Sequence, residues 1–172
     1  MFRRPGSLAE VMLIAPEEEA RPGPAEQAGE QAGAAEAPVA SERPCILLVE
    51  DDFLVGMEVE AGLREAGFEV AGIATTAEEA LAMASARRPA LAIMDIRLAG
   101  PRDGVDAALD LFRSLGIRSL FASAHGDSEV RARAAPARPL GWVAKPYRVE
   151  TLLGAVRAAL RELEGQPAGT SA

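Results

Sequence analysis

Short apolar runs and longer amphipathic segments alternate along most of the chain. The runs CILLVE, FEVAGIA, ALAIMD, SLFAS and GWVA are almost continuously apolar, which is typical of strands buried in a parallel sheet. The segments FLVGMEVEAGLREAG, TTAEEALAMASARRP, GVDAALDLFRSLG and VETLLGAVRAALREL repeat their apolar residues at intervals of three and four, as amphipathic helices do. The pattern therefore predicts five strands, each followed by a helix.

The ends of these helices carry recognisable signals. Gly67 follows the first predicted helix and is a typical C-terminal stop. The second helix opens with Thr75 or Thr76 three residues before a glutamate, which indicates a capping box, and it stops before Pro89. The helix between the fourth and fifth strands differs, because GDSEVRARAAPARPL offers barely two turns before Pro136. We expect that helix to be short or mobile.

Strands that alternate with helices in this way imply a parallel sheet covered on both faces. Five such units fit the flavodoxin-like, doubly wound α/β fold, with a five-stranded parallel sheet of order 2-1-3-4-5. We expect this domain over residues 44–164. Residues 1–43 are mostly Ala, Glu, Pro and Gly and cannot bury enough apolar surface to order, so we predict a disordered leader, followed after the domain by a loose tail at 165–172.

Composition narrows the classes of function. The net charge of −8 argues against a surface built for nucleic acid. No apolar run approaches the roughly 20 residues that cross a bilayer. The single cysteine cannot form an internal disulfide, which fits a reducing compartment. We therefore expect a cytoplasmic protein that binds neither nucleic acid nor membranes.

Polar and charged side chains follow four of the five predicted strands. In an open α/β sheet the functional site lies outside the carboxyl ends of the strands. The first strand ends in Glu50, Asp51 and Asp52, the third in Asp95, the fourth in Ser123 and the fifth in Lys145. Taken singly, each is explained by a solvated turn or a loop cap. Such explanations would have to hold at four strand ends at once, which favours a functional site.

The chemistry expected of this group follows from its charges. Crowded carboxylates either raise a pKa or recruit a cation, and hard oxygen ligands without a Cys or His cluster suit Mg²⁺. One carboxylate can then act as a nucleophile towards phosphorus and form an aspartyl phosphate. Lys145 is the only lysine among eighteen cationic residues, and its compact ammonium group would neutralise phosphoryl oxygens beside the metal.

At these residues the sequence resembles the receiver domains of two-component response regulators. The similarity rests on ILLVEDD, LAIMDIRL with a following DG, FASAHGD and WVAKPY, over about residues 44–164. It implies that Asp95 accepts a phosphoryl group from a histidine kinase or a histidine phosphotransfer protein. It also implies that Mg²⁺ is held by Asp51, by Asp95, by Glu50 through a water, and by the backbone carbonyl of Arg97.

The resemblance assigns further roles around the phosphoryl group. Ser123 would donate a hydrogen bond to a phosphoryl oxygen, and Lys145 would pair with the phosphate. The peptide bond between Lys145 and Pro146 would be cis. Trp142 stands where receivers usually carry a switch Tyr or Phe, and it would respond together with Ser123. Arg97 and His125 would flank the phosphoryl group and tune its lifetime. FASAHG is similar to the FATGYG-type single-domain receivers of alphaproteobacteria, with Ala and His in place of Gly and Tyr.

Three functions are weighed. The first is a stand-alone receiver that signals to a downstream protein target, because the segment after residue 164 is too short for an output domain. The second is a receiver-like module that binds proteins without phosphorylation, which the intact acids, Ser123 and Lys145 disfavour. The third is an aspartyl phosphatase, which needs an acid two residues after Asp95, where this chain has Arg97. Arg131 and Arg133 are expected to form a solvated helix face.

Overall fold

The computed structural model of the protein describes residues 43–124 and 128–165 of the chain. The elements are β1 (Cys45–Val49), α1 (Phe53–Glu65), β2 (Glu69–Ala74), α2 (Ala77–Arg87), β3 (Leu91–Asp95), α3 (Gly104–Leu115), β4 (Ser119–Ser123), α4 (Ser128–Ala134), η1 (Ala135–Ala137), β5 (Gly141–Ala144) and α5 (Val149–Gly165). Apart from Arg43 and Gly165, the predicted leader and tail lie outside the described residues, as does His125. The last helix runs one residue into the predicted tail.

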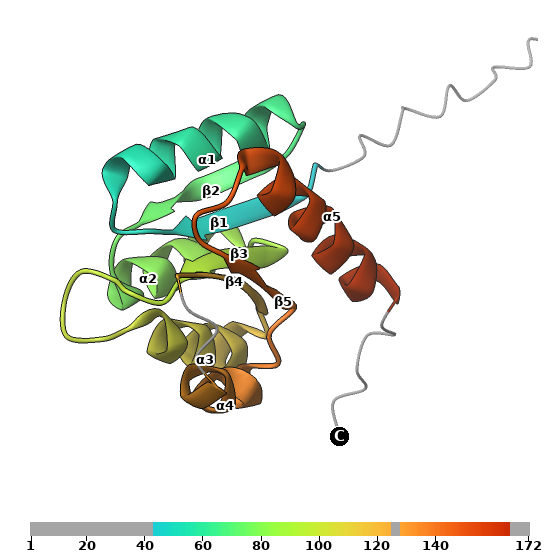
Figure 1. The fold of residues 1–172 in the computed structure, drawn as a ribbon. Helices are drawn as coiled ribbons and strands as arrows, with labels where there is room; N and C mark the ends of the chain where they lie inside the picture. The colour runs from blue at the N-terminus through green and yellow to red at the C-terminus, as the bar shows by residue number, and fades with distance from the viewer. Residues whose placement is uncertain (1–42, 125–127, 166–172) are drawn as a thin grey trace, which may run out of the picture. The chain divides into compact units, whose positions relative to one another are not determined.

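The five strands form one parallel sheet of order β2-β1-β3-β4-β5, which confirms the predicted fold. Helices α1 and α5 cover one face of the sheet, and α2, α3 and α4 cover the other (Figure 1). All strands end at the same side, which we call the carboxyl edge, and begin at the opposite side, the amino edge. No helix among the described residues is long and apolar enough to cross a membrane.

The central strands β1, β3 and β4 are almost entirely buried because both of their faces are covered. In β1, Ile46 and Leu48 point into the core beneath α1 and α5, whereas Leu47 and Val49 point into the core beneath α2 and α3. All four side chains are at most 1% exposed. Continuous burial leaves the strand ends as the places where this sheet can present polar groups to solvent.

The predicted capping box at the start of α2 is present, with one difference in its hydrogen bonds. The Thr76 hydroxyl accepts a hydrogen bond from the Glu79 amide at 3.1 Å and caps α2, while the Glu79 carboxylate accepts from the Thr75 amide at 2.8 Å rather than from Thr76. Arg88 ends α2 in the left-handed region, directly before Pro89. The helix α4 is seven residues long and passes into η1, which confirms that it is short.

Candidate functional site

Three carboxylates converge at the carboxyl edge between β1 and β3. Carboxylate oxygens of Glu50, Asp51 and Asp95 lie within 4.8 Å of one another. The side chain of Glu50 is almost fully buried, and that of Asp51 is exposed. Asp52 does not join them, because its Oδ1 accepts hydrogen bonds from the amides of Leu54 and Val55 and caps α1. We call the three converging residues, together with Lys145, the acid pocket.

The single lysine bridges two of these carboxylates. Lys145 Nζ donates to Glu50 Oε2 at 2.7 Å and to Asp95 Oδ2 at 2.8 Å. Its backbone amide donates to the Ser123 carbonyl at 2.7 Å, which sets the end of β5 beside the end of β4. The following Lys145–Pro146 peptide is cis. The expected approach of Lys145 to Asp95 is therefore present in the structure.

Burial and charge together shift the pKa values of Glu50 and Lys145. Burial raises the pKa of Glu50, the hydrogen bond from Lys145 opposes this, and the nearby charge of Asp95 adds to it. Burial acts to lower the pKa of Lys145, but hydrogen bonds to Asp95 and Glu50 outweigh it, and the pKa is raised. Lys145 therefore stays an ammonium, and three carboxylates face one cation. This negative excess and the all-oxygen donor set fit Mg²⁺.

The backbone of Asp95 is held from behind by a glycine. The Gly104 amide donates to the Ile96 carbonyl at 2.7 Å, and a Cβ at Gly104 would lie 1.8 Å from the Asp95 carbonyl oxygen. The preceding Asp103 caps α3 by accepting from the amides of Val105 and Asp106. Only glycine permits this close approach. The Asp-Gly pair in the sequence was the available signal, but spacing alone did not show what it contacts.

A cavity of about 490 Å³ opens beside Asp95. Its lining includes Arg97, Ser123 and Lys145 with Val130 of α4. The side chain of Ser123 is buried at 7% exposure, and that of Arg97 is exposed. The structure thus brings Ser123 and Arg97 to the acid pocket, as expected. Of the flanking pair expected to tune the site, only Arg97 lies among the described residues.

Trp142 does not line the cavity beside Asp95 but lines a neighbouring one, which Ser123 also lines. Its ring stacks on Phe121 with centroids 4.5 Å apart and planes at 12°, and Arg131 Cζ lies 4.7 Å from the Trp142 centroid. Arg133 pairs with Asp103 at 2.9 Å. Both arginines are exposed, as expected of a solvated face, yet each makes a contact that links α4 to a neighbouring element. Amphipathic spacing carried no signal for either contact.

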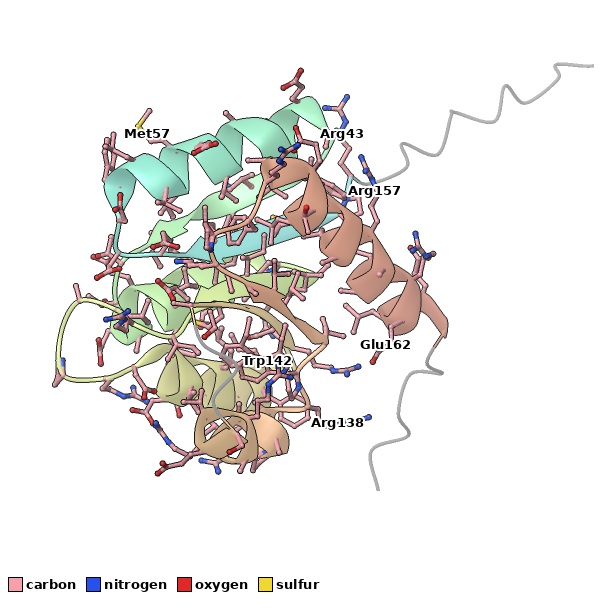
Figure 2. All side chains as sticks on the ribbon, in the orientation of Figure 1. Arg43, Met57, Arg138, Trp142, Arg157 and Glu162 are labelled. Atoms are coloured by element: carbon pink, nitrogen blue, oxygen red, sulfur yellow. The ribbon has the colours of Figure 1, made fainter. Side chains whose placement is uncertain are left out.

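The first turns of α1 carry an apolar surface that the sequence reasoning missed. Phe53, Leu54 and Met57 are 68%, 76% and 50% exposed, and Figure 2 shows Met57 projecting from the outer side of α1. A groove of about 380 Å³ beside α1 is lined by Tyr147 and reaches Lys145. We call Phe53, Leu54 and Met57 the α1 apolar patch. Its signal was the run FLVGM directly after the acids.

Fold, acid pocket and lysine together define a receiver, and comparison with known proteins agrees. Residues 46–157 match the response regulator receiver domain, so the chain belongs to that family. The "Transcriptional regulatory protein PdtaR" of Mycobacterium tuberculosis is 32% identical over 132 residues, which cover 73% of this chain and 64% of that protein. The "Phyllosphere-induced regulator PhyR" of Methylorubrum extorquens is 32% identical over 67% of this chain and 43% of its own length.

Solved structures show the same relationship. The signal receiver domain of a modulated diguanylate cyclase from Desulfovibrio desulfuricans G20 has a TM-score of 0.66 and 32% identity, covering 71% of this chain and 97% of that one. A CheY-like receiver domain protein from Methanospirillum hungatei JF-1 has a TM-score of 0.66 and 26% identity over the same shares. The chain spans less than two thirds of the two curated relatives named above. The part of this chain that resembles them is the receiver domain.

Proposed function

We propose that this chain is a response regulator in which Asp95 accepts a phosphoryl group from a phosphohistidine of a histidine kinase or histidine phosphotransfer protein. The observation that carries the proposal is the 2.8 Å approach of Lys145 Nζ to Asp95 Oδ2, in a pocket that holds two further carboxylates. A single ammonium facing an excess of acid is suited to a site that takes up a phosphoryl group.

The residues present fit Mg²⁺, with Asp51 and Asp95 as carboxylate ligands, Glu50 through a water and Arg97 through its carbonyl. When bound, the ion supplies positive charge for the phosphoryl oxygens. An Asp95 carboxylate oxygen attacks phosphorus, so that an O–P bond forms as the N–P bond of the donor breaks and leaves an imidazole. Lys145 exchanges its hydrogen bond with Asp95 for one with the incoming phosphoryl group. The Ser123 hydroxyl, which lines the same cavity, donates to another phosphoryl oxygen.

The proposed phosphodonor is a protein, and the α1 apolar patch supports this. Three large apolar side chains exposed at the start of α1, directly after the acids that follow β1 in the sequence, form a contact surface that a small phosphodonor does not need. A helical partner that covered Phe53, Leu54 and Met57 would bring its own histidine close to Asp95. The proposed output is likewise contact with a downstream protein, since the net charge of −8 disfavours nucleic acid.

The finer features of the proposal rest on the sequence. We place the chain with the FATGYG-type single-domain receivers because of FASAHG at the end of β4, and we assign tuning roles to Arg97 and His125. The protein is proposed to act in the cytoplasm. No catalysis is proposed beyond gain and loss of its own phosphoryl group, because Arg97 occupies the position where an aspartyl phosphatase needs an acid.

The test is phosphoryl uptake measured by intact mass. Wild-type chain incubated with Mg²⁺ and acetyl phosphate should gain the mass of one phosphoryl group, and Asp95→Asn should gain none. Asp110→Asn is the matched control, because Asp110 lies in α3 and pairs with Arg102 outside the acid pocket. Phosphorylated Asp95→Asn would place the acceptor elsewhere. A wild-type chain that takes up no phosphoryl group would favour the phosphorylation-independent binding module.

A further inference from the structure

Three cavities follow one another from the acid pocket to the outer side of β5. The first, beside Asp95, is bounded by Ser123. The second, of about 80 Å³, is lined by Ser123, Arg131 and Trp142. The third, of about 490 Å³, is lined by Trp142 and by the start of α5 with Thr151. Ser123 is shared by the first two cavities, and Trp142 is shared by the last two together with Val143 and Ala144.

Trp142 is held in place from two sides. Phe121, which is fully buried, stacks on the indole. Because a stacked phenyl ring fills one face of the indole, the guanidinium of Arg131, 4.7 Å from the centroid, lies over the other face. A guanidinium over an indole is attracted by the ring quadrupole. The indole therefore cannot leave this position without losing the contact with Arg131.

We propose that Arg131 is the positioning residue of Trp142: it latches the indole against Phe121 and so opposes the movement of Trp142 that follows phosphorylation. This inference rests on the proposed function, because the movement begins when Ser123 turns towards a phosphoryl group on Asp95. The second cavity is too small for an indole while Ser123 lines it. Withdrawal of Ser123 enlarges it, and Trp142 can tilt inward only if Arg131 releases the ring.

The latch also holds α4. A helix of seven residues is not stable alone in water, so tertiary contacts place it. Arg131 ties α4 to β5 through Trp142, and Arg133 ties it to α3 through Asp103 at 2.9 Å and Asp106 at 3.7 Å. Release of Arg131 removes one of these two ties. Trp142 and α4 then change together, which alters the surface formed by α4, β5 and the third cavity.

The direction of the effect follows from linkage. A contact made only in the latched conformation stabilises that conformation, and a ligand that favours the other one must overcome it. Removing the contact therefore tightens binding of a phosphoryl mimic. For a cation–π contact at an exposed site, the expected gain in affinity is about two- to fivefold.

The experiment is a titration of the full chain with beryllofluoride in the presence of Mg²⁺, read by fluorescence of Trp142, the only tryptophan in the chain. Arg131→Ala should bind beryllofluoride about two- to fivefold more tightly than wild type. Arg131→Lys, which keeps a cation, should lie between them. Arg133→Ala is the matched control, because it removes the same charge from the same helix without touching the indole. Without ligand, acrylamide should quench Trp142 more strongly in Arg131→Ala than in Arg133→Ala.

The outcomes separate the two proposals. If wild type responds to beryllofluoride and Arg131→Ala binds it equally or more weakly, the latch is wrong and the proposed function stands. An equal gain in Arg133→Ala would also overturn the latch, because loosening of α4 alone would then account for the effect. If wild type shows no Mg²⁺-dependent response in fluorescence and no phosphoryl uptake, the proposed function fails and the latch with it.

Discussion

Two cations, a buried arginine and a partly buried lysine, lie at opposite edges of the sheet, and their surroundings differ. At the carboxyl edge, the side chain of Lys145 is 22% exposed and contacts Glu50 and Asp95. At the amino edge, the side chain of Arg118 is 10% exposed and donates to Glu162 Oε1 at 2.7 Å and to the Arg138 carbonyl at 2.6 Å. Figure 2 shows Glu162 on α5 and Arg138 at the same side of the molecule.

The difference lies in the balance of charge. Arg118 donates to the Glu162 carboxylate and to the neutral Arg138 carbonyl, so its contacts link the start of β4, the segment before β5, and α5. Lys145 lies among three acidic side chains in the acid pocket, and burial raises the pKa of one of them, Glu50. An ion pair of this kind is sufficient to hold neighbouring elements together. An uncompensated excess is expected where a cation and a phosphoryl group are to be added.

The largest effect is expected from crowding the backbone behind the acid pocket. In Gly104→Ala the new methyl group would meet the Asp95 carbonyl oxygen, which belongs to the backbone and cannot move aside cheaply. We expect a loss of about 3 kcal/mol in the free energy of unfolding and a marked loss of phosphoryl uptake. Urea denaturation and intact mass with acetyl phosphate measure the two effects.

Gly154→Ala is the control for this change. A Cβ at Gly154, within α5, would meet nothing within 4 Å. It should stabilise the chain by about 0.5 to 1 kcal/mol through helix propensity and leave phosphoryl uptake unchanged. Equal unfolding free energies for Gly104→Ala and wild type would show that β3 and α3 do not approach as closely as described.

The next effect belongs to the amino edge. Arg118→Met removes the donor to the Arg138 carbonyl and should cost about 2 kcal/mol in the free energy of unfolding. Because Arg118 and its printed partners lie at the edge opposite the acid pocket, phosphoryl uptake per folded chain should not change. Arg161→Met, an exposed position on α5, should be nearly neutral. Loss of uptake in folded Arg118→Met would break the division between an architectural and a functional edge.

The order of elements and the meeting of strand ends were predictable because both follow from periodicity and from the geometry of parallel sheets. Asp95 and Lys145 are fifty residues apart, yet each ends a strand, so their approach needed no side-chain detail. Asp52 was less accessible to sequence reasoning, since its capping of α1 competes with a place in the acid pocket. Its position was decided by local backbone geometry, which spacing does not report.

Contacts made across the fold were not predictable. The approach of Gly104 to the Asp95 carbonyl depends on how α3 returns to β3, and no periodic signal records it. The contact of Arg131 with Trp142 depends on where a short helix rests on β5. The α1 apolar patch was missed for a different reason. Apolar residues at the start of a helix are read as core until the structure shows them exposed.

Removing one carboxylate from each edge should change stability in opposite directions. Without Mg²⁺ at pH 7, Asp95→Asn relieves the excess charge of the acid pocket and should raise the free energy of unfolding by about 1 kcal/mol. Glu162→Gln leaves Arg118 without its partner charge and should lower it by about 1 kcal/mol or less, because Glu162 is 45% exposed. Urea midpoints give the comparison.

Magnesium should sharpen this contrast. Saturating Mg²⁺ should stabilise wild type and Glu162→Gln alike, by about 2.7 kcal/mol at one hundred times the dissociation constant, and Asp95→Asn much less. If both substitutions destabilise the metal-free chain, Lys145 holds the acid pocket in balance, and the proposed excess of charge does not exist.

The smallest effect tests whether the excess of acid is confined to the pocket or extends along the carboxyl edge. The pKa of Glu79, at the start of α2, is lowered because its carboxylate accepts from the Thr75 amide and then from the Thr75 hydroxyl. With the folded pKa below the unfolded value of about 4.3, Glu79 stabilises the fold above that pH, and the contribution is lost as pH falls through the folded pKa. Glu79→Gln should therefore cost about 0.5 kcal/mol at pH 7 and less at pH 3, as urea denaturation at both pH values would show. Glu78→Gln is the control, because it removes the same charge one position earlier and loses a 3.7 Å contact with Arg102 instead of the Thr75 cap. An equal pH dependence in the two variants would mean that the charge of the whole edge, rather than the cap, sets the stability.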